Sequence, residues 1–274
     1  MKIALTGASG FVGRHVLTEL MQQDVEIVAI TRDSTKLSHF KKSILVLELD
    51  IYSDIDCYKA IGSPDVLIHL AWDGLPNYKS LHHFESELPR QYSFIKGMVE
   101  SGLKSLFVSG TCFEYGMQSG ALSANIPTYP TNPYGYAKDA LRKQLEFLKE
   151  IEPFNLIWAR LFYMYGEGQS SRSLYPQLKQ AVLRGDKVFN MSGGEQLRDY
   201  ATVETIAEMI VKLALSQRDI GAVNVCFGKP ISVRRLVEQW VQENDWEIEL
   251  NLGYYPYPDY EPMEFWGSIN VKNH

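Results

Sequence analysis

Short apolar runs alternate with amphipathic stretches through roughly the first 160 residues of the chain. Each run has the length of a β-strand, and after a turn the apolar positions recur every three or four residues, as on one face of a helix. Strands that alternate with helices in this way favour a parallel sheet covered on both faces. The expected strands are 3–5, 25–30, 44–49, 65–71, 105–108 and 154–161, and a further strand is expected at 223–226.

The pattern changes after Phe162, where glycine and polar residues become frequent. We expect a helix over 174–184, a strand over 187–190 and a helix over 233–244 in this part. An aromatic, proline-rich run over 254–266 follows, and it is too apolar for a disordered tail. We expect that run to cover a pocket.

These elements predict an α/β fold, namely a Rossmann-type doubly wound parallel sheet with a smaller, interleaved C-terminal substrate region. The dinucleotide-binding domain is expected over 1–162 and is completed by 200–227. The substrate-binding region is expected over 163–199 and 228–274. No internal repeat interrupts this order.

Three glycines lie between the first strand and the first helix, at Gly7, Gly10 and Gly13. In that position Gly7 permits a tight turn, Gly10 lets the backbone approach a pyrophosphate, and Gly13 lets the helix pack closely on the strand. The helix N-terminus, which begins with Phe11 and Val12, offers N–H groups to an anion. The arrangement predicts dinucleotide binding rather than a merely flexible turn.

The end of the second strand bears on the choice of cofactor, because an NAD site usually places Asp or Glu there. This chain has Thr31-Arg32. A guanidinium suits a 2′-phosphate, so NADP(H) is favoured over NAD(H). Asp33 follows and blurs the signal, and Arg32 as a solvated loop residue stays open.

Two more strand ends are expected beside the cofactor. Asp50-Ile51 follows the third strand, and Leu70-Ala71 follows the fourth. Asp50 can accept a hydrogen bond from an adenine amino group, with capping of the next segment as the alternative. His69 lies within the apolar fourth strand, where a packed structural histidine is expected.

A tyrosine and a lysine, Tyr134 and Lys138, lie four residues apart at the start of a helix and therefore share one face. A lysine cation lowers the pKa of a nearby phenol, which makes Tyr134 a candidate proton donor or acceptor. Thr111 ends the fifth strand, and its hydroxyl can bond the same substrate oxygen. The three residues together indicate redox chemistry at a carbonyl.

Composition excludes several other functions. The net charge of −6 and a pI near 5.6 argue against nucleic-acid binding. No apolar run reaches the ~20 residues of a membrane span, so a cytoplasmic protein is expected. Three distant cysteines, Cys57, Cys112 and Cys226, lack metal-ligand spacing, and we expect free buried thiols and no metal.

The ordered set of motifs resembles the extended short-chain dehydrogenase/reductase family, in its NAD-dependent epimerase/dehydratase group acting on nucleotide sugars. The resemblance covers nearly the whole chain. Its members here are Gly7, Gly10 and Gly13, then Asp50-Ile51, His69-Leu70-Ala71, Thr111 within 109–116, Tyr134 with Lys138, 160–168, and Arg198-Asp199-Tyr200.

The resemblance implies a role for each of these residues. Tyr134 is the general acid/base, Lys138 holds the nicotinamide ribose, and Thr111 bonds the sugar oxygen. The arginine matching Arg198 grips the diphosphate of a nucleotide sugar, which agrees with bidentate guanidinium recognition. Arg172 can assist there or can be a surface loop residue. Relatives often dimerise, and a homodimer is left open.

Departures from the family pattern narrow the activity. Family dehydratases carry an Asp-Glu pair where this chain has Cys112-Phe113, and Phe113 cannot transfer a proton. We therefore expect an NADPH-dependent reductase of a 4-keto-6-deoxyhexose, of the dTDP- or CDP-4-dehydro-6-deoxyglucose type, for polysaccharide synthesis. The alternatives are a nucleotide-sugar 4-epimerase with bound NAD and a non-catalytic dinucleotide sensor.

Overall fold

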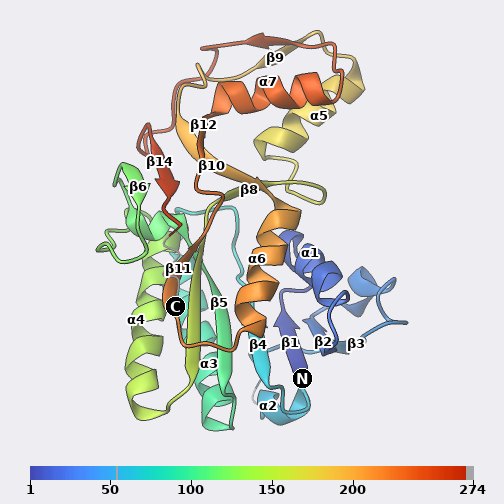
Figure 1. The fold of residues 1–274 in the computed structure, drawn as a ribbon, viewed down its shortest axis with the longest axis vertical. Helices are drawn as coiled ribbons and strands as arrows, with labels where there is room; N and C mark the ends of the chain where they lie inside the picture. The colour runs from blue at the N-terminus through green and yellow to red at the C-terminus, as the bar shows by residue number, and fades with distance from the viewer. Residues whose placement is uncertain (54, 270–274) are drawn as a thin grey trace.

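A seven-stranded parallel sheet forms the larger part of the protein, in a computed structural model that describes residues 1–53 and 55–269. The strand order is β11-β7-β5-β4-β1-β2-β3, so the chain starts near the middle and builds outward in both directions (Figure 1). The strands are β1 (Lys2–Thr6), β2 (Glu26–Thr31), β3 (Leu45–Glu48), β4 (Val66–His69), β5 (Ser105–Thr111), β7 (Asn155–Leu161) and β11 (Gly221–Val225).

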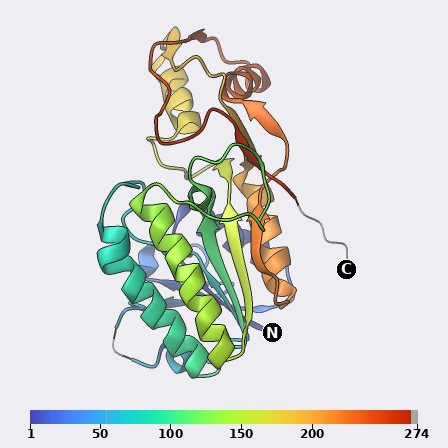
Figure 2. The same cartoon turned by 90° about the vertical axis from the view of Figure 1, so that its left-hand side faces the viewer.

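Helices cover both faces of this sheet, because successive strand residues point to opposite sides. Ile3 and Leu5 pack with α1 (Phe11–Leu20) and α6 (Val203–Leu215). The intervening Ala4 packs with the other layer, formed by α3 (Leu88–Glu100) and α4 (Pro133–Ile151). Figure 2 shows α3 and α4 side by side on their face. The predicted doubly wound α/β sheet is confirmed.

A smaller lobe lies beyond the carboxyl ends of the strands, at the top of Figure 1. Leu178, Val237 and Trp240 are at the centre of its own apolar core. The lobe consists of β8 (Tyr163–Tyr165), α5 (Leu174–Arg184), β9 (Val188–Asn190), β10 (Leu197–Thr202), β12 (Pro230–Ser232), α7 (Val233–Glu243) and β13 (Glu249–Asn251). The two helices match their predicted bounds to within a residue.

Several short elements were not anticipated from the sequence. Arg198-Asp199-Tyr200 lies within β10, a strand that the sequence did not predict, which pairs with β8 and β12 and leads directly into α6. The aromatic run ends in β14 (Phe265–Gly267), which pairs with β6 (Gly120–Leu122). Strands of three residues are too short to show an alternating pattern. The small helices are η1 (Ser34–Leu37), α2 (Cys57–Ala60), η2 (His83–Glu87) and η3 (Cys112–Tyr115).

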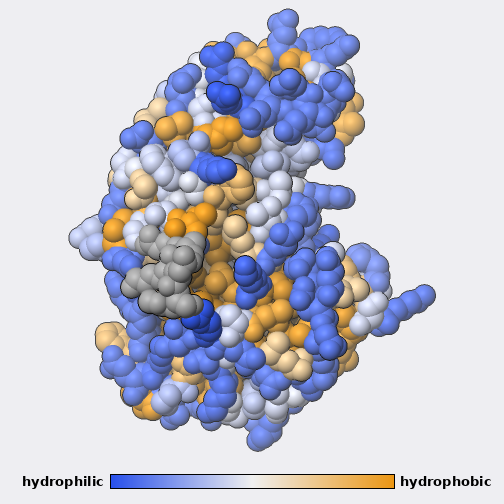
Figure 3. Space-filling view, viewed as in Figure 1, coloured by the Kyte–Doolittle hydropathy of each residue, from blue (hydrophilic) through white to orange (hydrophobic). Residues whose placement is uncertain are grey.

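The surface is indented between the smaller lobe and the body that holds the sheet, at the right of Figure 3.

The three cysteines, Cys57, Cys112 and Cys226, are buried free thiols. Within residues 1–53 and 55–269, no helix is long and apolar enough to cross a bilayer. The predicted substrate region extends to residue 274, and its last five residues lie outside the described part.

Candidate active site

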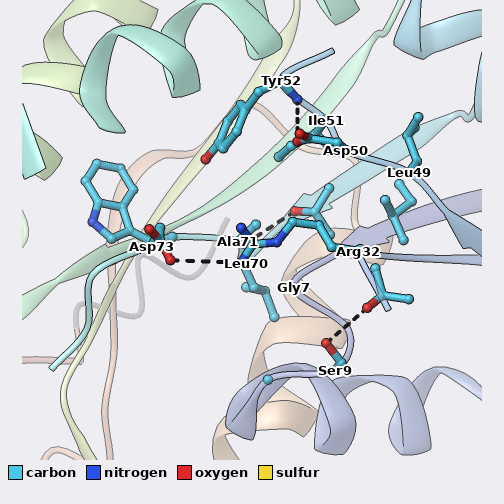
Figure 4. Close-up of a pocket in the computed structure, with 15 residues that line it drawn as sticks. Gly7, Ser9, Arg32, Leu49, Asp50, Ile51, Tyr52, Leu70, Ala71 and Asp73 are labelled. Atoms are coloured by element: carbon cyan, nitrogen blue, oxygen red, sulfur yellow. Dashed lines mark hydrogen bonds and ion pairs between the residues drawn. The ribbon is translucent and has the colours of Figure 1, made fainter. Parts of the chain in front are cut away.

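The carboxyl ends of β1, β2 and β4 open onto a cavity of about 240 Å³, shown in Figure 4. Such strand ends are where ligands bind in open α/β sheets. Seven predicted cofactor residues line it, namely Gly7, Gly10, Arg32, Asp50, Ile51, Leu70 and Ala71. The sequence prediction missed several others, including Ser9, Tyr52, Trp72 and Asp73.

The glycine turn fits a dinucleotide. Gly7 has φ of +69°, and a Cβ there would lie 2.8 Å from the backbone nitrogen of Ala71. A Cβ on Gly13 would lie 2.0 Å from the carbonyl oxygen of Gly7, so the helix packs on the turn only without it. Gly10 precedes α1 and no side chain caps the helix, which leaves its N–H groups for an anion.

Besides Gly13, Tyr134 and Lys138, two predicted cofactor residues do not line this cavity, namely Phe11 and Val12. They form the first turn of α1, where the Phe11 ring contacts the ring of His15 edge-on. Their place at the helix start suits contact through backbone N–H groups rather than through side chains. The identities of Phe11 and Val12 in the sequence do not tell whether the backbone or the side chain would contact the cofactor.

The end of β2 leaves a guanidinium facing the cavity. The Arg32 side chain is 71% exposed, and its Nη2 lies 3.9 Å from Asp73. The Asp33 carboxylate instead accepts hydrogen bonds from the backbone and hydroxyl of Thr35, at 3.0 and 2.5 Å, and caps η1. The Asp33 carboxylate is therefore engaged by η1, and the acid that the Arg32 guanidinium approaches is Asp73.

Asp50 and His69 have largely structural contacts. Asp50 lines the cavity, and its Oδ1 accepts from the backbone of Tyr52 at 3.1 Å in a turn, whereas the next helix, α2, is capped by Asp56. The His69 ring is buried between Thr6, at 2.7 Å, and Gln91. Burial lowers the pKa of His69 to about 3, which keeps the ring neutral.

A buried carboxylate, that of Glu87, lies behind the same cavity. Glu87 is fully buried, and its Oε1 accepts from Tyr52, Gln91 and the backbone of Asp73 at 2.6, 2.7 and 2.9 Å. Tyr52 and Asp73 both line the cavity. Glu87 therefore positions two residues of the cavity wall.

Tyr134 lies in the first turn of α4, which Asn132 caps by accepting from the backbone of Gly135 at 2.9 Å. The phenol is buried among aromatic rings. The nearest ring centroids belong to His83, Tyr78, Trp72 and Phe113, at 5.3, 5.6, 5.9 and 6.4 Å. These rings keep water from the phenol, and none of the four was predicted to pack there.

Burial strongly raises the pKa of Tyr134, and the nearby Tyr78 and Glu114 add to the effect. A side-chain hydrogen bond between Tyr134 and Thr111 acts in the opposite direction. Tyr134 therefore carries its proton at neutral pH, beside the predicted hydroxyl partner. Thr111 also caps η3 by accepting from the backbone of Phe113 at 3.3 Å.

Lys138 is 1% exposed and does not act as the sequence argument expected. Its Nζ donates to the carbonyl of Ser109 at 2.8 Å, lies 3.9 Å from the Trp72 ring centroid, and is 6.0 Å from that of Tyr134. Burial lowers the pKa of Lys138 to about 7, against the influence of Glu114 and Glu87. Burial therefore outweighs the predicted lowering of the Tyr134 pKa by Lys138, and the pKa of Tyr134 is raised overall.

Neither residue after Thr111 is an acid–base group in this structure. Phe113 packs on Tyr78, with centroids 4.9 Å apart, and burial strongly raises the pKa of the Cys112 thiol. Glu114, the nearest acid in sequence, forms a buried ion pair with Arg160 at 2.6 Å and accepts from Trp158. No side chain from 112 to 114 is free to support elimination of water.

A second cavity, of about 320 Å³, lies between the smaller lobe and the C-terminal segment. Arg198 lines it and is 3% exposed, and Phe189, Asn190 and Tyr260 are among the other lining residues. Arg198 pairs with Glu261 at 2.8 Å, which the sequence did not predict. Arg172 is exposed in the loop before α5 and does not line this cavity.

Known proteins resemble the chain throughout its length. The model of the NAD dependent epimerase/dehydratase family matches residues 3–226. A dTDP-6-deoxy-L-talose 4-dehydrogenase (NAD(+)) from Aggregatibacter actinomycetemcomitans is 30% identical, over 98% of this chain and all of the relative. A UDP-glucose 4-epimerase from Halalkalibacterium halodurans is 24% identical, over 87% of this chain and 79% of the relative.

Solved structures show the same fold. A UDP-N-acetylglucosamine 4-epimerase from Methanobrevibacter ruminantium superposes with a TM-score of 0.87 at 21% identity, over 98% of this chain and 89% of that one. A UDP-glucuronic acid 4-epimerase from Bacillus cereus, in complex with NAD, superposes with a TM-score of 0.83 at 22% identity, over 98% and 88%. With the family model covering most of its length, the chain belongs to the NAD dependent epimerase/dehydratase family.

Proposed function

We propose that this protein reduces the 4-keto group of a nucleotide-activated 4-dehydro-6-deoxyhexose. The substrate is of the dTDP- or CDP-4-dehydro-6-deoxyglucose type, and NADP(H) is favoured over NAD(H). The observation that carries the proposal is the burial of the Tyr134 phenol among aromatic rings, one helical turn from the buried Lys138 on α4. A relative named a 4-dehydrogenase of a dTDP-linked 6-deoxysugar supports it, because a dehydrogenase run backwards is a 4-ketoreductase.

Each of the three residues has a definite part in such a reduction. A bound nicotinamide supplies the hydride for the ketone carbon. Tyr134 gives its proton to the ketone oxygen, and its raised pKa makes it an acid rather than a base at rest. Thr111 bonds the same oxygen, and the buried Lys138 cation stabilises the phenolate that proton transfer leaves behind.

The preference for NADP rests on Arg32. Its exposed guanidinium lines the dinucleotide cavity, whereas the Asp33 carboxylate is bonded to Thr35. A guanidinium can hold a 2′-phosphate bidentately. The printed name of the talose 4-dehydrogenase specifies NAD(+), so the two cofactors must be compared directly on this protein.

Oxidation of NADPH and NADH, followed at 340 nm with dTDP- and CDP-linked 4-keto-6-deoxy sugars, tests the proposal. We expect turnover with at least one of these sugars and a higher kcat/KM for NADPH. Absence of turnover across the panel, with a protein that binds the dinucleotide, would contradict the reductase and support a non-catalytic sensor. The sensor gains nothing from Thr111, Tyr134 and Lys138 in one site.

A 4-epimerase is the second candidate, because several relatives and structural neighbours carry that name. An epimerase of this kind keeps its NAD through the cycle, whereas the proposed reductase exchanges its cofactor. Acid denaturation of the freshly purified protein separates the two. Release of about one NAD per chain would favour the epimerase, and a cofactor-free supernatant would favour the reductase.

A further inference from the structure

The C-terminal segment occupies the guanidinium of Arg198. Nε and Nη2 donate to Glu261 Oε2 at 3.1 and 2.8 Å, and Nη1 donates to the carbonyls of Leu197 and Met263 at 2.8 and 3.1 Å. These bonds use at least three of the guanidinium's five N–H groups. Arg198 as it stands is therefore an anchor for the segment and presents little to an incoming anion.

Glu261 takes the place that an anionic ligand would need. Its other oxygen, Oε1, accepts from the Tyr163 hydroxyl at 2.5 Å, and the side chain is only 10% exposed. Glu261 and Arg198 are the two charged side chains among the residues that line the 320 Å³ cavity. The positive charge of Arg198 is thus neutralised by the Glu261 carboxylate, which accepts hydrogen bonds from Arg198 and Tyr163.

We propose that Glu261 is an internal stand-in for substrate phosphate, and that a nucleoside diphosphate binds by displacing the Glu261 carboxylate from Arg198. This inference rests on the proposed function, because the substrate there carries a diphosphate. A diphosphate bears more negative charge than a carboxylate and matches the guanidinium fork equally well. The two anions repel each other at close range, so they do not share Arg198. Displacement also frees the Tyr163 hydroxyl as a donor.

The segment that carries Glu261 is an irregular connection between two strand pairs. Residues 252–263, between β13 and β14, form neither helix nor strand, and Tyr254 and Tyr255 are more than half exposed. Regular pairing holds both ends, through β9 and β6. The segment also touches the loop over the catalytic tyrosine, since Lys79 Nζ lies 5.9 Å from the Tyr260 ring centroid and follows Tyr78. Release of Glu261 is therefore felt beside Tyr134.

The test measures dTDP and thymidine binding by calorimetry, in wild type and in Glu261→Gln. The amide keeps the shape but removes the competing charge, so we expect dTDP to bind about tenfold more tightly. Thymidine has no phosphate and should bind both proteins equally. Glu264→Gln is the matched control, since Glu264 is exposed on the same segment and should leave dTDP affinity unchanged.

Unchanged or weaker dTDP binding in a folded Glu261→Gln protein overturns the inference, because Glu261 would then be neutral towards the ligand or one of its contacts. If that variant does not fold, Glu261→Asp keeps the charge but cannot reach both Arg198 and Tyr163. It should then bind dTDP about threefold more tightly, and unchanged or weaker binding again overturns the inference. The binding measurement needs no turnover, so its result is independent of the reductase assay. Tighter dTDP binding without ketone reduction would contradict only the proposed function.

Discussion

The dinucleotide cavity is shaped mainly by backbone, whereas the Arg198 cavity is shaped mainly by side chains. The first is shaped by backbone, at a glycine turn where added Cβ atoms would collide with Gly7 and Ala71. The second is shaped by side chains from distant segments, with Arg198 and Glu261 sixty-three residues apart. A backbone cradle is complete before a ligand arrives, whereas an ion pair must be opened. The dinucleotide cavity is therefore preformed, whereas in the Arg198 cavity the guanidinium is already paired with a carboxylate of the protein itself.

The largest expected effect is at Tyr134, which lines neither cavity. Tyr134→Phe should lower kcat by roughly 10³-fold, because the proton donor is lost while the ring still packs. Dinucleotide affinity should be unchanged, which would show that the Tyr134 hydroxyl does not contribute to the structure of the dinucleotide cavity. Steady-state kinetics and cofactor titration measure both. Tyr136→Phe, on the same helix and exposed, should be close to wild type, and retained turnover in Tyr134→Phe would refute the mechanism.

The glycine turn should be the most sensitive part of the preformed side. Gly13→Ala places a Cβ about where the Gly7 carbonyl oxygen lies, so α1 must shift. We expect dinucleotide affinity to fall by about 100-fold and stability by about 1–3 kcal/mol. Gly97→Ala in α3 meets open space and should stabilise the protein slightly, by about 0.5–1 kcal/mol. If Gly13→Ala and Gly97→Ala had the same dinucleotide affinity and the same Tm, the glycine turn would not be the rigid part of the cavity that we describe.

Lys138 provides a pH test of the buried catalytic layer. Its folded-state pKa, near 7, lies below the unfolded value, so the unfolded chain binds more protons between pH 7 and about 10.4. The lysine therefore costs most stability below pH 7, and the cost falls as pH rises. Lys138→Met should raise Tm by several degrees at pH 6.5 and by less at pH 9, while abolishing turnover. A Tm difference independent of pH would contradict the assignment.

Arg32 is an exposed, charged residue of the dinucleotide cavity, and replacing it tests the predicted choice of cofactor. Arg32→Ser should lower the ratio of NADPH to NADH affinity by about tenfold, because a charge-assisted pair to the 2′-phosphate is worth about 1.5–3 kcal/mol. NADH affinity itself should hardly change. Lys36→Ser, a nearby exposed cation, is the control for general charge effects. An equal loss for both dinucleotides would show that Arg32 has no part in discrimination.

Arg172 should have the smallest effect of the predicted site residues. It is exposed and lines neither cavity, so Arg172→Ala should change the KM for the nucleotide sugar by less than about twofold. The same substitution at buried Arg198 removes the charge that the Glu261 carboxylate is bonded to. A large KM change for Arg172→Ala would show that its loop folds over the substrate, and that the Arg198 cavity is incomplete as described.

Sequence reasoning succeeded where the structure depends on local backbone. The strand, the glycines and the first helix follow one another directly, so their roles were readable, and seven predicted residues do meet in one cavity. The fold class followed from the alternation of strands and helices. Both are properties of neighbouring residues, which a single sequence records.

It failed where a property depends on surroundings. The spacing of Tyr134 and Lys138 gave their common helix face but not their burial, which reverses the expected pKa of the tyrosine. Glu261 was one acid in an aromatic run, and nothing local marked Arg198 as its partner. The ring of Trp72 over Lys138 likewise joins residues from β4's end and α4. Such contacts are set by the fold and have no fixed spacing in the chain.

The strand order has a consequence for how the protein is made. β1, β2 and β4 emerge early from the ribosome, so the cofactor cradle can assemble while most of the smaller lobe is still untranslated. The edge strand β11 arrives only after β8, α5 and β10, which commits the nascent chain to build half of the lobe before it closes the sheet. Glu261 comes later still, so Arg198 spends part of biosynthesis without its counter-charge.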